Sequence, residues 1–306
     1  RRSIRIASVF GLVSLLVLIW SGDGSAYHVA KRQPMKLAAM EGLYRSEHGT
    51  PIVAFGILNP KKSISRLDRD SLGFALEKPY LFNISIPKGL SLLVDRKLNT
   101  FVPGIEDIIQ GGYTYKDEFG IEHTALPVRE RMKRGKIAIE ALALYHKTKE
   151  AGDEEGKEIA LRDLRENFSH FGYGYLEKPT DVVPNIPATF YAFRIMVILG
   201  GFFILLFILS IYLERNDLIS KARWFHITAI ASIPLVYICS QAGWIVAEMG
   251  RQPWTIQDLL TTSASVSGVS ASSVMTTTVM FFVLFSVLLA AEMTILFKVI
   301  KKGPAA

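Results

Sequence analysis

The chain has 306 residues, half of them hydrophobic, and carries a net charge of +7 with an isoelectric point near 9.3. Its mean hydropathy of +0.27 averages strongly apolar runs with one long polar stretch, which indicates a membrane protein that has a sizeable hydrophilic part. The single cysteine, Cys239, excludes an intrachain disulfide and a cluster of thiolate metal ligands. No stripe of basic and aromatic residues points to a nucleic-acid partner, so the positive charge is better explained by basic cytoplasmic loops.

Four apolar runs are long enough to cross a membrane as helices, since about 20 residues span the hydrocarbon core. They are approximately Ile4–Trp20, Ala192–Leu213, Trp224–Glu248 and Ser273–Ile300. The first run also resembles a signal peptide, because basic residues precede it and small residues follow it. Its length of about 17 residues exceeds most signal-peptide cores and favours a transmembrane helix. The chain begins with arginine instead of methionine, which suggests that it has lost its beginning.

Basic residues predict the orientation of these four helices. If every run crosses the membrane once, three basic clusters fall on the same side, which the positive-inside rule makes cytoplasmic. Residues 21–190 then face outward as a large extracytoplasmic loop domain. The clusters are Arg1, Arg2 and Arg5; Arg215, Lys221 and Arg223; and Lys298, Lys301 and Lys302.

The polar stretch has the pattern of a folded domain. Short apolar runs at Ile52–Leu58, Tyr80–Ile86 and Leu90–Val94 predict strands or extended segments. Helical spacing predicts helices from Val128 to about Lys149 and from Glu154 to Phe168, and prolines suggest an extended approach to the second span. We therefore expect an all-α membrane protein with a transmembrane helix at 1–20, a loop domain at 21–190 and a three-helix membrane region at 191–306.

The end of the third apolar run, Gly243 to Trp254, carries polar groups that are costly in lipid. Trp244, Glu248 and Arg251 share one face of a helix, because they follow each other at intervals of four and three residues. Pro253 then ends the helix. Ionisable groups at such a depth indicate a functional site, so something other than lipid must lie against this face.

The second apolar run opens with Phe193-Arg194-Ile195-Met196. Arg194 can extend to the headgroups, and a methionine in an apolar helix usually serves packing. The alternative is a thioether ligand on haem iron at Met196, with Arg194 near a propionate. Positions two apart differ by about 200° around a helix, so Arg194 would have to reach sideways.

The segment Gln33 to Gly42, just after the first apolar run, contains Lys36 and Glu41. These two would ordinarily belong to a solvated face. Close to the membrane surface they also suit an amphipathic headgroup that releases protons on oxidation, because a carboxylate accepts a proton and an amine holds an oxygen. In a regular helix they differ by about 140°, so they line one site only if the segment bends or the ligand lies across it.

None of the histidines lies deep in an apolar run, so a haem within the helices would need imidazoles from outside this chain. Glu248 is an unusual but possible iron ligand. Glu292, near the inner end of the fourth run, is either a residue of a proton path or an acid paired with Lys298. The sequence does not favour one of these two roles.

Three motifs together resemble subunit I of cytochrome bd quinol oxidase, and the resemblance covers essentially the whole chain as the C-terminal portion of that subunit. They are Lys36-Leu-Ala-Ala-Met-Glu41, Phe193-Arg-Ile-Met196 and Gly243-Trp-Ile-Val-Ala-Glu-Met-Gly-Arg-Gln-Pro-Trp254. Phe171-Gly-Tyr-Gly174 resembles the subgroup whose quinol-binding loop, the Q-loop, is long. Within the third motif, Met249 stands where an aromatic residue is common.

The resemblance implies a role for each matching residue. Met196 corresponds to an axial ligand of haem b558, with Arg194 beside that haem. Glu248 corresponds to the ligand of haem b595, Trp244 to an indole between haem b558 and the pair of haems b595 and d, and Arg251 to a propionate partner. Four residues correspond to quinol-binding positions: Lys36, Glu41, Gln33 and Asp23.

The implied activity is oxidation of membrane quinol at the outer side and reduction of dioxygen to water, which generates a membrane potential without proton pumping. The implied location is the cytoplasmic membrane of a prokaryote, and the implied partners are a second large membrane subunit and small accessory subunits. Haem d and one side of haem b558 would be held by helices absent from this chain, which leaves a fragment and a split subunit as alternatives. A non-catalytic membrane sensor with an outward ligand-binding domain is the alternative function.

Overall fold

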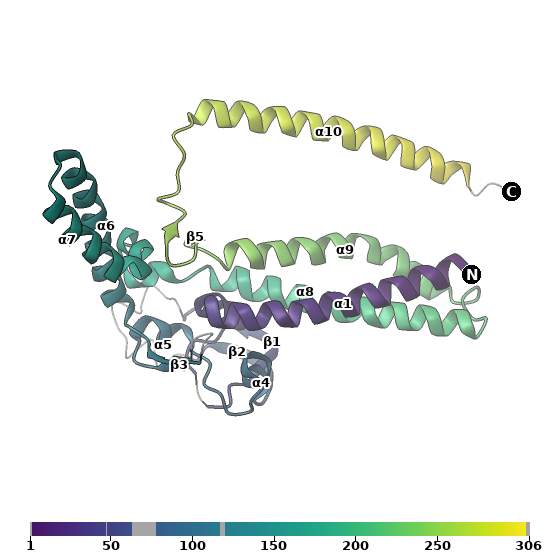
Figure 1. Cartoon of the computed structure of the whole chain (residues 1–306). Helices are drawn as coiled ribbons and strands as arrows, with labels where there is room; N and C mark the ends of the chain where they lie inside the picture. The colour runs from purple at the N-terminus through teal and green to yellow at the C-terminus, as the bar shows by residue number, and fades with distance from the viewer. Residues whose placement is uncertain (1, 47, 63–77, 117–119, 304–306) are drawn as a thin grey trace. The chain divides into compact units, whose positions relative to one another are not determined.

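A computed structural model of the chain describes residues 2–46, 48–62, 78–116 and 120–303 (Figure 1). The chain forms two compact units, Arg1–Ala264 and Ser265–Ala306. The described part is mostly helical, and four of its helices are long and apolar enough to cross a membrane. This confirms the predicted fold class, with small sheets in the region between the first and second of these helices.

Three of the four apolar helices pack together in the first unit: α1 (Arg2–Arg32), α8 (Ile186–Arg215) and α9 (Arg223–Met249) (Figure 1). The helix α1 continues well past Trp20, where we predicted its end. No proline interrupts the chain before Pro34, and the basic residues Lys31 and Arg32 favour the C-terminal end of a helix dipole. The first part of the predicted loop domain is therefore helical.

The helices α1 and α8 approach closely through small and polar side chains. The Ser8 hydroxyl donates a hydrogen bond of 2.8 Å to the Ser210 hydroxyl, and a Cβ atom on Gly11 would lie only 2.5 Å from the ring of Phe207. One turn further, the Arg5 guanidinium donates two hydrogen bonds of 2.8 Å to Glu214. Small residues at such crossings allow the close packing that holds helices together in lipid.

We call residues 33–185 the loop region. Its elements in chain order are α2 (Pro34–Glu41), β1 (Ile52–Leu58), β2 (Tyr80–Ile86), α4 (Gly89–Asp95), α5 (Ile105–Gln110), β3 (Thr114–Lys116), β4 (Glu122–Thr124), α6 (Val128–Ala151), α7 (Glu154–Asn167), and the 3₁₀ helices η2 (Phe168–Tyr175) and η3 (Pro179–Val182).

The strands β1 and β2 have the predicted bounds and pair in antiparallel fashion, with Ile52 opposite Ile86. The prediction of a strand at Leu90–Val94 is wrong, because these residues form α4. Leu90, Leu93 and Val94 pack into one apolar cluster at helical spacing. A run of four to eight apolar residues fits a buried strand as well as a buried helix, so hydrophobicity alone does not distinguish the two structures.

We call residues 33–127 the earlier loop region and residues 128–185 the later loop region. The two helices predicted in the later loop region are confirmed as α6 and α7, which pack against each other (Figure 1). The buried face of α6 includes the small residues Gly135, Ala138 and Ala141 as well as Met132, whereas Ile137 and Leu144 are exposed. Beyond α7, Pro179 starts the 3₁₀ helix η3 and Pro187 lies in the first turn of α8, so the predicted extended approach is short.

The helix α2 lies where the loop region meets the bundle of α1, α8 and α9. Pro34 begins it, and Gly42, with a φ of +63°, ends it in the left-handed conformation that glycine adopts without strain. Six of its eight residues are buried. Its apolar side chains belong to two clusters, one with α5 and α6 and one with α8 and α9. Position and orientation of α2 are therefore fixed by packing on several sides.

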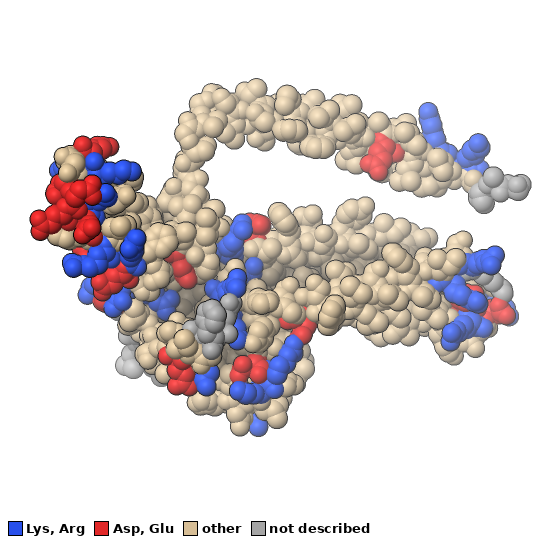
Figure 2. Space-filling view, in the orientation of Figure 1, with Lys and Arg blue, Asp and Glu red and all other residues tan. Residues whose placement is uncertain are grey.

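After α9, the chain forms a short hairpin of β5 (Trp254–Ile256) and β6 (Leu260–Thr261), which the sequence did not predict. Figure 2 shows acidic and basic side chains gathered on the loop region and at the far ends of α1, α8 and α9, with an uncharged stretch between them. This distribution is typical of a bundle that crosses a bilayer.

The second unit consists mainly of α10 (Ala271–Lys302). Its first turn is capped by Ser270, whose side chain accepts the backbone N–H of Ser273, and its last turn carries Lys301 and Lys302. Within this described helix, Glu292 and Lys298 form no ion pair. The pairing that we considered for Glu292 is therefore not formed.

Candidate functional site

The last residue of α2, Glu41, forms a buried ion pair with Arg194 of α8. The Arg194 Nη2 donates a hydrogen bond of 2.7 Å to the Glu41 Oε2, and only 2% and 6% of the two residues are exposed. The Arg194 guanidinium also lies over the rings of Phe190 and Phe193. A charge in this position is stable only while its partner remains, because neither group can be solvated.

Burial raises the pKa of the Glu41 carboxyl, and the Arg194 guanidinium opposes this rise by its charge and its hydrogen bond. The other oxygen of the carboxyl, Oε1, and the Arg194 Nε are buried and make no hydrogen bond to any described residue. Such unsatisfied groups are uncommon in a folded protein and require a reason. The buried Glu41 carboxylate therefore has one oxygen paired with Arg194 and one oxygen that can accept a further hydrogen bond.

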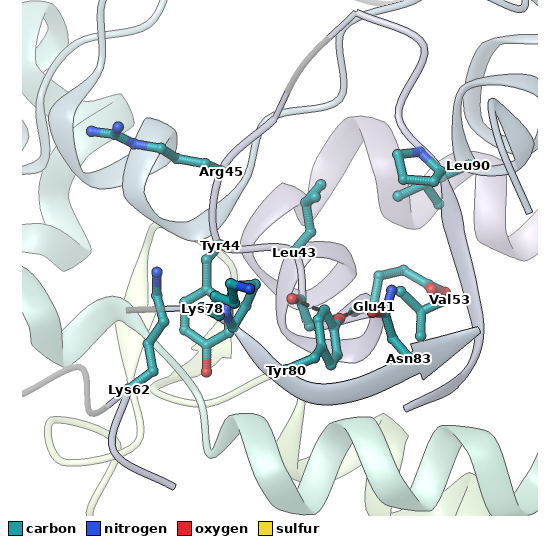
Figure 3. Close-up of a pocket in the computed structure, with 13 residues that line it drawn as sticks. Glu41, Leu43, Tyr44, Arg45, Val53, Lys62, Lys78, Tyr80, Asn83 and Leu90 are labelled. Carbon is teal, nitrogen blue, oxygen red and sulfur yellow. Dashed lines mark hydrogen bonds between the residues drawn. The ribbon is translucent and has the colours of Figure 1, made fainter. Parts of the chain in front are cut away.

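The hydroxyl of Tyr80 on β2 contacts the end of α2. It lies 2.9 Å from the backbone carbonyl oxygens of both Glu41 and Gly42, and burial raises its pKa. Figure 3 shows Tyr80 beside Glu41. Both residues line a pocket of about 490 Å³. The pocket includes the basic side chains of Arg45, Lys62 and Lys78. The backbone of Glu41 thus faces this pocket, whereas its carboxylate turns to α8.

Lys36 of α2 points to the C-terminal end of α9. Its Nζ donates a hydrogen bond of 3.3 Å to the carbonyl oxygen of Ala247, and a Cβ atom on Gly250 would lie 3.2 Å from the Lys36 Cγ. A cation at this end of a helix interacts favourably with the last carbonyls. Burial, and next the charge of Arg251, lower the pKa of Lys36, and Glu248 opposes them.

Glu248 and Arg251 are adjacent at the end of α9, as their spacing predicted. The Arg251 Nη2 donates a hydrogen bond of 2.5 Å to the Glu248 Oε2, and each side chain is about 40% exposed. Trp244, one turn earlier, is largely exposed. These three side chains therefore leave polar and aromatic surface uncovered near the end of a membrane helix.

Met196 of α8 faces Gly243 of α9, which has no side chain. A Cβ atom on Gly243 would lie 3.2 Å from the Met196 Sδ. Arg194 contacts α2 and Met196 contacts α9. They have different partners because residues two apart point in directions about 200° apart around a helix. The thioether therefore lies between two helices, close to the turn that carries Trp244.

The other two candidate residues for quinol binding lie apart from each other. Gln33 connects α1 to α2, and its Oε1 is buried without a hydrogen bond from the described residues. Asp23 lies on α1, roughly 15 Å of helix before Gln33, and forms an ion pair with Arg96 at the end of α4. The structure brings Lys36 and Glu41 onto one short helix and leaves Asp23 outside their surroundings.

Sequence reasoning did not find Tyr80, nor the hydrogen-bonded group of Arg131, Tyr173 and Asp258 behind the β5–β6 hairpin. Tyr80 was recognised only as the first residue of a strand. The polar pair Gln257-Asp258 between two short apolar segments is a turn signal, and it could have predicted the hairpin but not its partners.

These features define a class: a helical membrane protein whose loop region is tied by charged side chains to the ends of two membrane helices. A model of the family "cytochrome bd terminal oxidase subunit I" matches residues 1–304. Cytochrome bd-II ubiquinol oxidase subunit 1 of Escherichia coli K12 is 29% identical over all of this chain and 56% of its own length. Cytochrome bd ubiquinol oxidase subunit 1 of Bacillus subtilis 168 is 27% identical over 99% of this chain and 49% of its own length.

A solved structure of bd oxidase from Geobacillus thermodenitrificans has the same fold over 98% of this chain and 48% of that chain, with a TM-score of 0.54 and 22% identity. The chain belongs to the cytochrome bd oxidase subunit I family. It spans about half the length of the relatives that it matches. Family membership confirms the resemblance.

Members of this family bind haem. A thioether ligates haem iron in cytochromes, and a carboxylate oxygen ligates iron in other iron proteins. The Met196 sulfur lies beside Gly243, where any larger residue would crowd it. The Arg251 Nε is buried without a hydrogen-bond partner among the described residues, so it is available as a donor to a propionate. Met196, Glu248 and Arg251 therefore fit the group.

Proposed function

We propose that this chain supplies the quinol-oxidising loop and part of the haem-binding helices of a cytochrome bd-type quinol:oxygen oxidoreductase. One observation carries the proposal: the short helix α2 contacts both membrane helices that bear candidate haem ligands. Its Glu41 binds Arg194, two residues before Met196 on α8. Its Lys36 binds the Ala247 carbonyl on α9, next to Glu248. A quinol headgroup bound at α2 would lie beside both ligand-bearing helices. Electrons could then leave it over a short distance.

In this proposal Lys36 and Glu41 bind and deprotonate the quinol headgroup. The Lys36 ammonium donates a hydrogen bond to a quinol oxygen in place of the Ala247 carbonyl. Glu41 accepts a proton, for which its pKa, raised by burial, is suited, and its free Oε1 is the available atom. Gln33 offers its buried Oε1 as a further acceptor, whereas Asp23 orients α1 against α4 through Arg96.

In the membrane helices, Met196 would ligate the iron of haem b558 and Glu248 would ligate the iron of haem b595. Arg251 would contact a propionate, and Trp244 would lie towards the next haem. Haem d would be held in part by other helices. When bound, the haems supply the one-electron carriers and the iron at which dioxygen is reduced to water. Arg194 balances the charge of Glu41 and opposes the rise of its pKa that burial causes.

The complete oxidase would contain a second large membrane subunit and small accessory subunits, and would lie in the cytoplasmic membrane with the loop region outside. With protons released outside and taken up inside, turnover would generate a membrane potential without pumping. Quinol and dioxygen are the proposed substrates.

A reduced-minus-oxidised optical spectrum of membranes that carry the full gene tests the proposal. We expect b- and d-type haem bands. Met196→Leu should remove or shift only the low-spin b band, and Glu248→Ala should disturb the high-spin haem and oxygen reduction. Met275→Leu on α10 and Glu140→Ala on α6, both exposed, are the matched controls. Absent haem bands, or full haem content and turnover in both site variants, would refute the assignment.

A further inference from the structure

A hydrogen-bonded group of polar side chains around the buried Tyr173 joins the later loop region to the hairpin that follows α9. The turn of that hairpin places Asp258 against η2, with a φ of +61° that aspartate adopts more readily than most residues. The Tyr173 hydroxyl donates a hydrogen bond of 2.8 Å to the Asp258 Oδ1, and the Arg131 Nη1 donates one of 3.1 Å to the Tyr173 hydroxyl. Three segments distant in sequence thus meet at the Tyr173 hydroxyl.

Backbone contacts make this junction specific. The Gly172 N–H donates a hydrogen bond of 2.9 Å to the Asp258 carbonyl oxygen, and a Cβ atom on Gly172 would lie only 2.7 Å from that oxygen. On the other side of η2, a Cβ atom on Gly135 of α6 would lie 2.3 Å from the Gly174 nitrogen. Both approaches require glycine, so α6, η2 and the hairpin fit together in one way.

An aromatic contact completes the junction. The rings of Tyr173 and Trp254 have centroids 4.9 Å apart, and both residues are almost fully buried. Trp254 is the first residue of β5, so the contact fixes the hairpin at its base as well as at its turn. Burial raises the pKa of Asp258, while Tyr173 and Arg131 oppose the rise.

The base of the hairpin is connected to the end of α9 by a short series of hydrogen bonds. The Trp254 N–H donates to the Arg251 carbonyl oxygen at 3.0 Å. The Thr262 hydroxyl donates to the Gln252 Oε1 at 3.1 Å, and the Gln252 Nε2 reaches the Glu248 carbonyl oxygen at 3.5 Å. A movement of the hairpin would therefore be transmitted to the turn that carries Glu248 and Arg251.

We propose that Arg131, Tyr173 and Asp258 are positioning residues that lock α6 and η2 onto the β5–β6 hairpin and thereby hold Glu248 and Arg251 in place. This inference rests on the proposed function, because it gives the later loop region a task at the proposed high-spin haem site. The earlier loop region, with α2, would bind quinol. The later loop region would maintain the geometry of the carboxylate and guanidinium without touching quinol.

Tyr173→Phe in the oxidase produced from the full gene tests the lock. The variant keeps the ring on Trp254 and removes both hydrogen bonds of the hydroxyl. Losing a hydrogen bond to a charged group should increase amide hydrogen exchange in residues 254–262 about tenfold. We expect the high-spin haem band to shift, the low-spin b band to stay unchanged, and kcat to fall while KM for quinol is kept.

Tyr175→Phe is the matched control, because Tyr175 lies on the same 3₁₀ helix with an exposed side chain. Asp258→Asn keeps the size of the side chain and removes its charge, and it serves as the second variant should Tyr173→Phe not accumulate. An unshifted high-spin band in Tyr173→Phe or Asp258→Asn would overturn the inference, even if hydrogen exchange increased. Wild-type membranes without haem bands would instead refute the proposed function.

Discussion

Charged side chains at the junction of the loop region and the bundle are arranged so that each depends on its partner. Glu41 and Arg194 are both buried and contact each other directly. Lys36 has a backbone carbonyl as its acceptor, which a ligand could replace without leaving another charge unpaired. At the residue scale, the ion pair is thus the more rigid contact and Lys36 the more adaptable one.

Glu41→Ala should destabilise the protein by about 3–5 kcal/mol, because it leaves the Arg194 guanidinium buried without its carboxylate. The double variant Glu41→Leu with Arg194→Met should recover most of that loss, since apolar side chains of similar volume need no partner. The free energy of unfolding of the detergent-solubilised protein measures both effects. Glu140→Ala, an exposed site on α6, is the control. A change below about 1 kcal/mol in Glu41→Ala would contradict the role of the pair.

The lowered pKa of Lys36 predicts a pH effect on quinol binding. Burial and Arg251 lower the pKa from its ordinary 10.5, so the ammonium is lost at lower pH than in a free lysine. Between the lowered pKa and 10.5 the unfolded state binds more protons, and the free energy of unfolding therefore rises with pH in that window. KM for quinol should increase as pH rises through the lowered pKa.

Lys36→Arg should move that increase in KM to higher pH, because a guanidinium stays protonated. Lys136→Arg, on the exposed face of α6, should leave the profile of the wild type unchanged. Identical pH profiles of KM in the wild type and Lys36→Arg would show that another group is responsible.

At the scale of elements, short segments are positioned by neighbours that are remote in sequence. The helix α2 has eight residues, too few to be stable alone, and it forms because six of them are buried. The 3₁₀ helix η2 similarly depends on α6, which approaches it through Gly135. In both cases the packing partner decides the conformation.

Gly135→Ala should destabilise the later loop region by about 1–3 kcal/mol, because the new methyl group would overlap the backbone of η2. Limited proteolysis of residues 128–175 and the free energy of unfolding report the change. Gly201→Ala on α8 is the matched control, since its added Cβ would meet nothing beyond its own helix within 4 Å in the described part of the chain. If the two alanine variants behave alike, the close approach of α6 and η2 is not needed for stability.

At the scale of the whole molecule, most of the apolar surface of the membrane helices is left uncovered by the described chain. In the 18-residue apolar windows of α1, α8 and α9, only 6%, 11% and 17% of the residues are buried within the described chain. The relatives that it matches are about twice as long. The uncovered surface is what lipid and the further helices of an oxidase would contact.

Single cysteines in a Cys239→Ala background test the orientation of the complete protein. A membrane-impermeant maleimide should label Lys97→Cys, in the loop region, in intact cells. It should label Asp217→Cys, between α8 and α9, only after the cells are broken, because basic residues predict that this connection is cytoplasmic. Labelling of Asp217→Cys in intact cells would reverse the predicted topology.

The sequence alone determined the four long helices, the strands β1 and β2, the helices α6 and α7, and the neighbours Glu248 and Arg251. All of these follow from apolar length, periodicity and spacing within one segment, which are local properties of a chain. The same local signals failed at Leu90–Val94, where a helix replaced the predicted strand, and at the end of α1.

Only the tertiary structure decided which side chains meet. Glu41 and Arg194 are 153 positions apart, and Lys36 and Ala247 are 211 apart. Tyr173 and Asp258 are separated by 85. Such contacts depend on how buried faces pack and on which glycines allow backbones to approach, and these conditions arise only once the helices and the hairpin are assembled.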